Sequence, residues 1–319
     1  MLQTCCAMYE LSLVITLLNE EENISPLHSA IRAALSGYNY EVVFVDDGST
    51  DGTVREIKKL QNDRVKLVKL SKNYGQSIAM SAGIDHAQGE YIVLLDGDLQ
   101  NDPADIPFML EKLKSEDWDV VAGNRRNRQD GMFLRKLPSN IANAMIRRYT
   151  GVHLRDYGCT LKIFKHEIAK NLDLYGELHR FIPVLASLQG ARIVQVDVHH
   201  HARKFGHSKY GIGRTFKVAS DLILILFLQR YLRKPMHLFG GIGLFLLLPG
   251  ILIMLYMLVI KLLGENIWGK PILILGVLLI IIGVLFIMMG IMTELLMRIY
   301  YGTGNRRLYL VKELYNGAN

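Results

Sequence analysis

The chain has 319 residues, a formal net charge of +7 and three cysteines, and 50% of its residues are hydrophobic. Three cysteines are too few to stabilise a chain of this length through disulfide bonds, which excludes a disulfide-rich secreted domain and favours reduced thiols. The positive charge suits contact with the anionic phosphates of lipid head groups and of a substrate, and we expect no nucleic-acid partner.

Strand-like and helix-like segments alternate in the first part of the chain. Strands are predicted at Leu11–Leu17, Tyr40–Val45, Val65–Leu70, Tyr91–Leu95 and Asp119–Ala122, and helices at Asn23–Leu35, Thr53–Gln61, Ile78–Ala87 and Pro107–Ser115. This alternation predicts an α/β fold whose mostly parallel sheet is covered by helices on both faces. The region from Gly123 to Tyr210 is less regular and rich in Arg and Gly.

Polar and acidic residues follow three of the predicted strands. They are Asn19-Glu20, Asp46-Asp47 and Asp96-Gly97-Asp98. Ligands of open α/β sheets bind outside the carboxyl ends of the strands, so we expect the three segments to share one site. Asp47 could accept hydrogen bonds from a nucleobase or a ribose. The same segment could also form an Asx turn with a helix cap at Ser49 or Thr50.

The pair Asp96 and Asp98 is a candidate seat for a hard divalent cation. Such a cation needs oxygen ligands, and Mg²⁺ or Mn²⁺ usually shares them with substrate phosphates. An Asp-x-Asp sequence also occurs in solvated turns, so the prediction of a cation site depends on the position of this one at a strand end. His199-His200-His201 does not predict zinc, because consecutive strand residues point to opposite faces.

Two basic clusters follow the acidic strand ends. They are Gly123–Arg128 and Arg203-Lys204-Phe205-Gly206-His207-Ser208-Lys209. In the second cluster, Gly206 allows close backbone approach while Ser208 and Lys209 supply donors, a combination that suits a diphosphate. Either cluster alone is more often a solvated or lipid-facing surface.

Two uncharged apolar stretches, Leu238–Ile260 and Pro271–Thr293, follow a candidate amphipathic helix at Ile212–Leu232. Each stretch is long enough to cross a hydrocarbon core of about 30 Å. The alternatives are buried core helices for the stretches and an ordinary surface helix for Ile212–Leu232. The linker from Lys261 to Lys270 is short and basic residues flank the pair, so a hairpin with both ends in the cytoplasm is expected.

Four motifs in this order resemble the inverting family 2 glycosyltransferases, which have the Rossmann-like GT-A fold. They are Val14–Glu20, Val45–Thr53, Asp96–Gln100 and Arg203-x-x-Gly206-x-Ser208-Lys209. With its two C-terminal spans, the chain is most similar to the polyprenyl-phosphate glycosyltransferases, which include dolichol-phosphate mannose synthase and the bacterial GtrB-type enzymes. The resemblance covers nearly the whole chain.

The resemblance implies a role for each motif residue. Asp98, Asp156 and Arg125 are expected to be catalytic, and Asp96, Asp98 and Gln100 to hold Mg²⁺ or Mn²⁺. The nucleotide sugar is expected to contact Thr16, Leu18, Glu20, Val45, Asp47, Asp96, Gly97, Arg203 and Lys209. Arg135 and Ser139 match an Arg-x-x-x-Ser spacing associated with the acceptor phosphate. Thr16 and Leu18 stand where the family often has Pro and Tyr, so this motif does not identify the base.

The expected organisation is a GT-A catalytic domain over residues 1–210, a juxtamembrane region over 211–235, two transmembrane helices over 236–297 and a cytoplasmic tail over 298–319. The tail segment Arg306–Val311 could be a strand that pairs with a neighbouring subunit, so a homo-oligomer such as a tetramer is expected. The protein is expected in the cytoplasmic (inner) membrane with its catalytic domain in the cytoplasm.

The implied reaction is the inverting transfer of a sugar to undecaprenyl phosphate, with UDP-glucose as the first expected donor. GDP-mannose and a modified UDP-arabinose are the alternative donors. A processive polysaccharide synthase is a rival, although Gln229–Arg233 does not fit its Gln-x-x-Arg-Trp motif and only two spans exist. A non-catalytic membrane scaffold is the second rival, against which the acidic and basic sets both argue.

Overall fold

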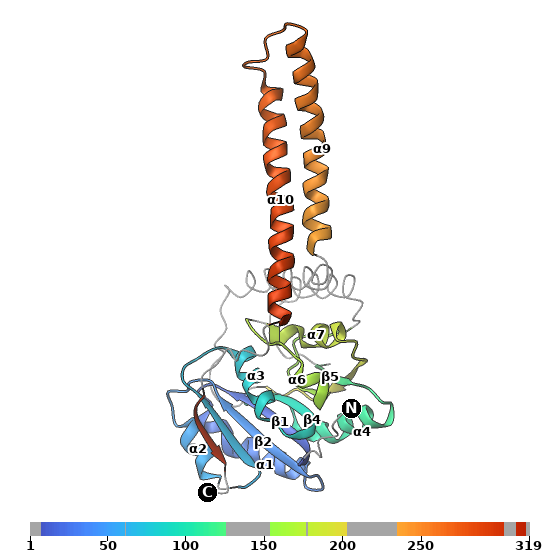
Figure 1. Ribbon diagram of the computed structural model, residues 1–319. Coiled ribbons are helices and arrows are strands. Elements are labelled where there is room, and N and C mark those ends of the chain that lie inside the picture. The colour runs from blue at the N-terminus through green and yellow to red at the C-terminus, as the bar shows by residue number, and fades with distance from the viewer. Residues whose placement is uncertain are drawn as a thin grey trace. The chain divides into compact units, whose positions relative to one another are not determined.

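The computed structural model describes residues 8–60, 62–125, 154–176, 178–202, 235–302 and 311–316. Two compact units divide the chain, one over residues 1–223 with 307–319 and the other over 224–306. The first unit holds an eight-stranded sheet in the order β7-β5-β6-β4-β1-β2-β3-β8, and the second holds two long helices (Figure 1).

The sheet is mixed, with a parallel centre. Its strands are β1 (Tyr9–Leu17), β2 (Tyr40–Asp46), β3 (Val65–Leu70), β4 (Gly89–Asp96), β5 (Val120–Arg125), β6 (Lys162–Lys165), β7 (Ile193–Val198) and β8 (Val311–Asn316). The strand β1 pairs in parallel with β2 and β4, and β2 with β3, while β6 runs antiparallel to β4 and β5. The predicted mostly parallel α/β sheet is therefore confirmed.

Helices cover both faces of the sheet. In chain order the helical segments of this unit are η1 (Glu21–Asn23), α1 (Ile24–Ala34), α2 (Thr53–Lys59), α3 (Gln76–His86), η2 (Pro103–Asp105), α4 (Ile106–Ser115), α6 (His166–Lys170), η3 (Leu178–Phe181) and α7 (Ile182–Leu188). Every residue of β2 is buried, as expected for a strand with helices on both sides.

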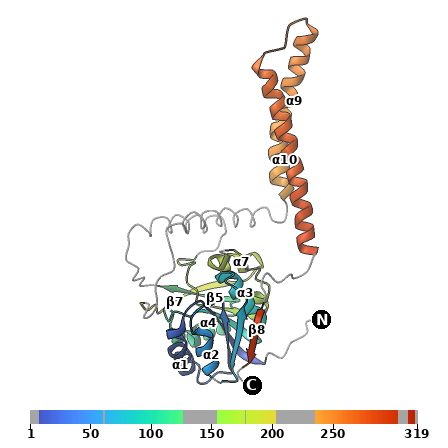
Figure 2. The ribbon, with the colours of Figure 1, turned by 90° about the vertical axis from the view of Figure 1, so that its left-hand side faces the viewer.

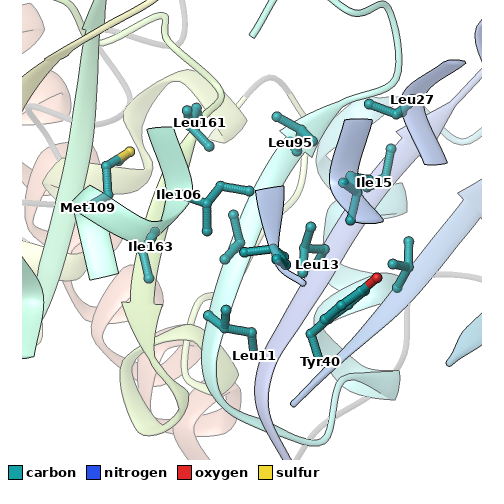
Figure 3. Close-up of a cluster of buried hydrophobic side chains, with 14 of the residues drawn as sticks. Leu11, Leu13, Ile15, Leu27, Tyr40, Leu95, Ile106, Met109, Leu161 and Ile163 are labelled. Carbon is teal, nitrogen blue, oxygen red and sulfur yellow. The ribbon is translucent and has the colours of Figure 1, made fainter. Parts of the chain in front are cut away.

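Alternate residues of each strand supply two separate cores. On one face, Leu13 and Ile15 pack with apolar side chains of α1 and α4, as Figure 3 shows. On the other face, Val14 packs with residues of α3, α6 and α7. This period of two follows from strand geometry, in which successive side chains point to opposite faces.

Two features of the fold differ from the prediction in ways that affect the site. The strand β5 continues past Ala122 to Arg125, so this arginine lies at a strand end. The region after Gly123 is also more regular than expected, because β6, α6, α7 and β7 all lie in its described part.

The predicted tail segment Arg306–Val311 lies outside the described residues except for Val311. The strand β8 begins at Val311 and pairs antiparallel with β3 of the same chain. It covers the edge that β3 would otherwise expose, and Glu313 forms an ion pair with Lys58 of α2. Figure 2 shows β7 and β8 at opposite sides of the sheet. The homo-oligomer stays a prediction, without this strand as its basis.

The second unit consists of α9 (Pro235–Leu262) and α10 (Pro271–Gly302). Both are long and apolar enough to cross a membrane, over Met236–Leu262 and Pro271–Leu296. Large apolar side chains such as Phe245 and Leu262 are more than 70% exposed, which argues against helices buried in a protein core. The two helices approach closely at glycines, since a Cβ at Gly243 would lie 2.7 Å from the Gly283 carbonyl oxygen.

We expect Gly243→Ala to loosen this hairpin, because the added methyl would force the two helices apart. Gly241→Ala is the matched control, since a Cβ there meets nothing within 4 Å. Thermal unfolding of the full chain in detergent should show a lower midpoint for Gly243→Ala and an unchanged or slightly higher one for Gly241→Ala. Equal midpoints for the two variants would contradict the glycine contact.

Candidate functional site

Strand register brings the three predicted motifs together. Thr16 of β1 pairs with Val45 of β2 on one side and with Asp96 of β4 on the other. The Asp47 backbone N–H donates to the Leu17 carbonyl at 2.9 Å, which continues the ladder past the end of β2. The carboxyl ends of the three central strands therefore form one polar edge, as expected.

Asp46 and Asp47 each organise a turn. The Asp46 carboxylate accepts the Ser49 N–H at 3.1 Å, three residues on, so it holds this turn without the two-residue spacing of an Asx turn. The buried Asp47 carboxylate accepts the N–H groups of Tyr74 at 2.7 Å and Gly75 at 2.9 Å. Burial raises the pKa of Asp47, while these two hydrogen bonds oppose the rise. Asp47 thus holds the turn that begins α3.

The first polar loop is attached to the second. Asn19 has a φ of 51°, its side-chain oxygen accepts the Thr50 N–H at 2.8 Å, and its own N–H donates to Ser49 Oγ at 2.8 Å. The Glu20 carboxylate accepts from Asn23 Nδ2 at 2.6 Å. These contacts fix the loop between β1 and α1 against the loop between β2 and α2.

A tight turn carries Asp96 and Asp98. A Cβ at Gly97 would lie 2.1 Å from Leu17 Cδ2, so a larger residue here would displace the Leu17 side chain at the end of β1. Leu99 has a φ of 59°, an unfavourable conformation for a bulky residue. The Gln100 N–H donates to Asp98 Oδ1 at 3.1 Å, which folds the chain back toward the second carboxylate.

Asp96 is held by two side chains that the sequence did not indicate. Gln76 Nε2, in the first turn of α3, donates to Asp96 Oδ1 at 2.8 Å. The Thr160 hydroxyl, from the segment before β6, donates to Asp96 Oδ2 at 2.6 Å. Burial and the nearby charge of Asp98 raise the pKa of Asp96 to about 6, and the Thr160 hydrogen bond opposes this rise.

The donor chemistry fits a hard divalent cation. Asp96, Asp98 and Gln100 offer carboxylate and amide oxygens, the ligands that Mg²⁺ and Mn²⁺ prefer. Burial and then the neighbouring charge of Asp98 raise the pKa of Asp96, and a bound cation would offset both costs. Among the described residues, no group of three or more His, Cys, Asp and Glu side chains could hold a metal, so a cation here would also need substrate or water oxygens.

Arg125 and Asp156 form a bidentate ion pair. Arg125 Nε lies 2.7 Å from Asp156 Oδ2, and Arg125 Nη2 lies 3.0 Å from Asp156 Oδ1. Both side chains are largely buried, at 13% and 14% exposed. The Gly158 N–H also donates to Asp156 Oδ1 at 3.0 Å. The two predicted catalytic residues are therefore brought together as one unit.

Lys162 is a buried cation that the sequence reasoning missed. It lies on β6 with 2% of its surface exposed, and its ammonium group donates to the Cys159 carbonyl. Burial lowers the pKa of Lys162, while the charges of Asp156 and Asp96 oppose the decrease. A lysine between Leu161 and Ile163 in an apolar run was the available signal for a buried charge.

The histidine run binds carboxylates. His199 Nδ1 lies 2.7 Å from Asp105 Oδ1, and the His199 N–H donates to Asp105 Oδ2 at 2.7 Å. His201 Nε2 lies 3.0 Å from Asp102 Oδ2. The chain after β7 is thereby attached to the segment after Gln100, a contact that the sequence argument against zinc did not reveal.

Several predicted features lie outside the described residues. They are Arg135, Ser139, Arg203, Lys209 and the helix at Ile212–Leu232. The described part of the site therefore comprises the strand-end carboxylates, the Arg125–Asp156 pair and the residues that support them.

Comparison with known proteins gives matches over most of the chain. The family described as glycosyl transferase family 2 matches residues 12–173. A dodecaprenyl-phosphate galacturonate synthase from Rhizobium johnstonii is 45% identical over 315 residues, which cover 96% of this chain and 93% of the relative.

Solved structures share the fold of the first unit. Glucosyl-3-phosphoglycerate synthase from Mycobacterium tuberculosis, crystallised with Mn²⁺ and UDP-glucose, matches with a TM-score of 0.56 at 20% identity over 70% of this chain and 79% of that one. TarS from S. aureus, crystallised with UDP-GlcNAc, matches with a TM-score of 0.51 at 19% identity over 68% of this chain and 66% of that one. At these identities the likeness establishes the fold alone.

We expect Asp105→Asn to lower the pKa of His199, because the hydrogen bond and negative charge of Asp105 raise it. The stability that this pair contributes is present below the ordinary histidine pKa of 6.5 and is lost as the pH rises through the higher folded value. A histidine NMR titration should show the His199 signal shift to lower pKa in Asp105→Asn. An unchanged His199 titration would contradict the pairing.

Proposed function

Because the chain belongs to glycosyl transferase family 2, we propose that it transfers a sugar from a nucleotide sugar to a polyprenyl phosphate. The acceptor class is supported by the Rhizobium relative, which is named for a dodecaprenyl-phosphate product and aligns with nearly the whole chain. The structural observation that carries the proposal is the register that places Thr16, Val45 and Asp96 side by side.

The donor we propose first is nucleotide-linked galacturonate. UDP-glucose was the first expectation from the sequence, but the name of the relative favours an acidic sugar. UDP-glucose is therefore the second candidate, followed by GDP-mannose and a modified UDP-arabinose. Undecaprenyl phosphate or a similar polyprenyl phosphate is the proposed acceptor.

Most of the predicted site residues divide into four groups by the part of the reactants, or the cation, that they would contact. We assign the nucleoside to the edge formed by Thr16, Leu18, Glu20, Val45 and Asp47. Asp96, Asp98 and Gln100 would hold Mg²⁺ or Mn²⁺ beside the diphosphate, next to Gly97. A cation there supplies electrostatic stabilisation of the charge that develops on the leaving diphosphate. Arg203 and Lys209 remain the proposed diphosphate contacts, and Arg135 and Ser139 the proposed acceptor-phosphate contacts.

The attacking group needs little general-base help. An acceptor phosphate is already anionic near neutral pH, so one of its oxygens can form the bond to the anomeric carbon as the bond to the nucleoside diphosphate breaks. In-line attack inverts the anomeric centre. Asp156 is already engaged in two hydrogen bonds with Arg125, so we assign it to orienting this arginine toward the donor.

The two apolar helices suit the proposed acceptor. A polyprenyl chain resides in the bilayer, and α9 and α10 are long enough to anchor the enzyme there. Basic residues outside the hairpin, Arg230, Arg233 and Lys234 before it and Arg306 and Arg307 after it, favour a cytoplasmic location for both ends. We therefore propose an inner-membrane enzyme with its catalytic domain in the cytoplasm.

We expect Asp98→Ala to abolish transfer while the protein stays folded, because the variant loses a buried carboxylate at the cation site. Asp63→Ala, at an exposed loop position before β3, is the matched control. Formation of radiolabelled lipid product and the thermal unfolding midpoint should be measured for both. Full turnover by Asp98→Ala would refute the cation role.

A donor screen tests the reaction itself. Membranes that contain the full chain are incubated with undecaprenyl phosphate, with Mg²⁺ or Mn²⁺, and with one nucleotide sugar at a time. The mass of the lipid product is then measured by mass spectrometry. We expect a single-hexuronate product from UDP-galacturonate. A polymer would instead favour a processive synthase, and the absence of both turnover and metal-dependent donor binding would favour a scaffold.

A further inference from the structure

The Asp96 carboxylate accepts hydrogen bonds from two distant parts of the chain, and we call these two hydrogen bonds the clamp. Gln76 lies 20 residues before Asp96 and Thr160 lies 64 residues after it, yet each donates to a different carboxylate oxygen. Hydrogen bonds of this kind, to an ionised group, are the stronger class in proteins. A carboxylate accepts up to about four hydrogen bonds, so both oxygens retain lone pairs for a cation or a sugar hydroxyl.

Each of the two donors is itself fixed by a predicted site residue. Gln76 follows Gly75, which has a φ of 94°, and the Tyr74 and Gly75 N–H groups donate to Asp47. Asp47 therefore sets the point at which α3 begins and Gln76 projects. Asp47, directly after β2, therefore determines through the turn at Tyr74 and Gly75 where Gln76 meets Asp96 at the end of β4.

Thr160 belongs to a short segment with three anchors. Asp156 is bound to Arg125, the Cys159 carbonyl accepts from the buried Lys162, and the Thr160 hydroxyl donates to Asp96. The segment from Asp156 to Thr160 thus joins the Arg125 ion pair to the Asp-x-Asp turn.

We propose that Gln76 and Thr160 are positioning residues of the transfer reaction, which act by fixing the orientation of the Asp96 carboxylate at the cation site. This inference rests on the proposed function of that site. Removal of the two donors would leave the nearby charges of Lys162 and Arg125 in place but would take away the two side-chain hydrogen bonds that set the orientation of the Asp96 carboxylate.

Thr160→Val and Thr160→Ser form a matched pair that tests the clamp. Valine keeps the shape of threonine but has no hydroxyl, whereas serine keeps the hydroxyl. We expect Thr160→Val to weaken Mn²⁺ binding to the full chain in detergent by about 10-fold or more, the usual loss when a partner of a metal ligand is removed. Thr160→Ser should stay close to wild type. The probe is Mn²⁺ alone, and its binding is monitored by electron paramagnetic resonance.

Three further measurements make the test specific. Gln76→Met removes the other donor and should also weaken Mn²⁺ binding, which keeps the proposal testable if Thr160→Val does not fold. In an Asp96→Asn background, Thr160→Val should cause no comparable further loss, because the clamp acts through Asp96. Thermal unfolding midpoints show whether each variant is folded.

The proposal is overturned if folded Thr160→Val and Gln76→Met bind Mn²⁺ as tightly as wild type, or if Thr160→Ser is as weak as Thr160→Val. A wild-type protein that shows the expected Mn²⁺ pattern but yields no lipid-linked sugar in the donor screen would support the clamp and contradict the proposed function. If the wild-type protein makes the lipid-linked sugar but Thr160→Val and Gln76→Met bind Mn²⁺ as tightly as wild type, the proposed function is supported and the clamp is contradicted.

Discussion

The site depends on holding two carboxylates together at the end of a buried strand. Burial and the repulsion between Asp96 and Asp98 raise the pKa of Asp96 to about 6. The hydrogen bonds from Gln76 and Thr160 support the ionised state of Asp96. The turn between the two acids packs Gly97 closely against Leu17 and gives Leu99 a positive φ, so backbone strain at Leu99 accompanies the placement of both acids.

The support for this pair extends through most of the described site. Asp47 shapes the start of α3, α3 presents Gln76, and Gln76 meets Asp96 opposite Thr160. The segment that carries Thr160 also carries Asp156, which holds Arg125. Residues that the motifs assign to separate ligand contacts are thus members of one hydrogen-bonded framework. A change at Asp47 would therefore alter the cation site as well as any nucleoside contact.

The sequence predicted the strand ends well because the signal there is local. Each central strand is a run of apolar residues that ends in acids, and parallel pairing then places those ends at one edge. Gln76, Thr160 and Lys162 could not be found in this way, since their roles arise from contacts between segments that only the fold brings together. The partner of β8 could not be found from the sequence for a related reason: only the fold shows that the edge of β3 is available to it.

The charge balance of the framework explains why a cation and an anionic donor belong together. Asp96, Asp98 and Asp156 share the described site with two cations, Arg125 and the buried Lys162, and the carboxylates of Asp46 and Asp47 lie at the same edge of the sheet. Without a metal these described carboxylates outnumber the two cations and would repel a diphosphate. A divalent cation would offset part of the negative charge, so donor binding and metal binding should each strengthen the other by the same factor. Lys162 matters in this balance because its charge acts on Asp156 and Asp96 from a buried position on β6.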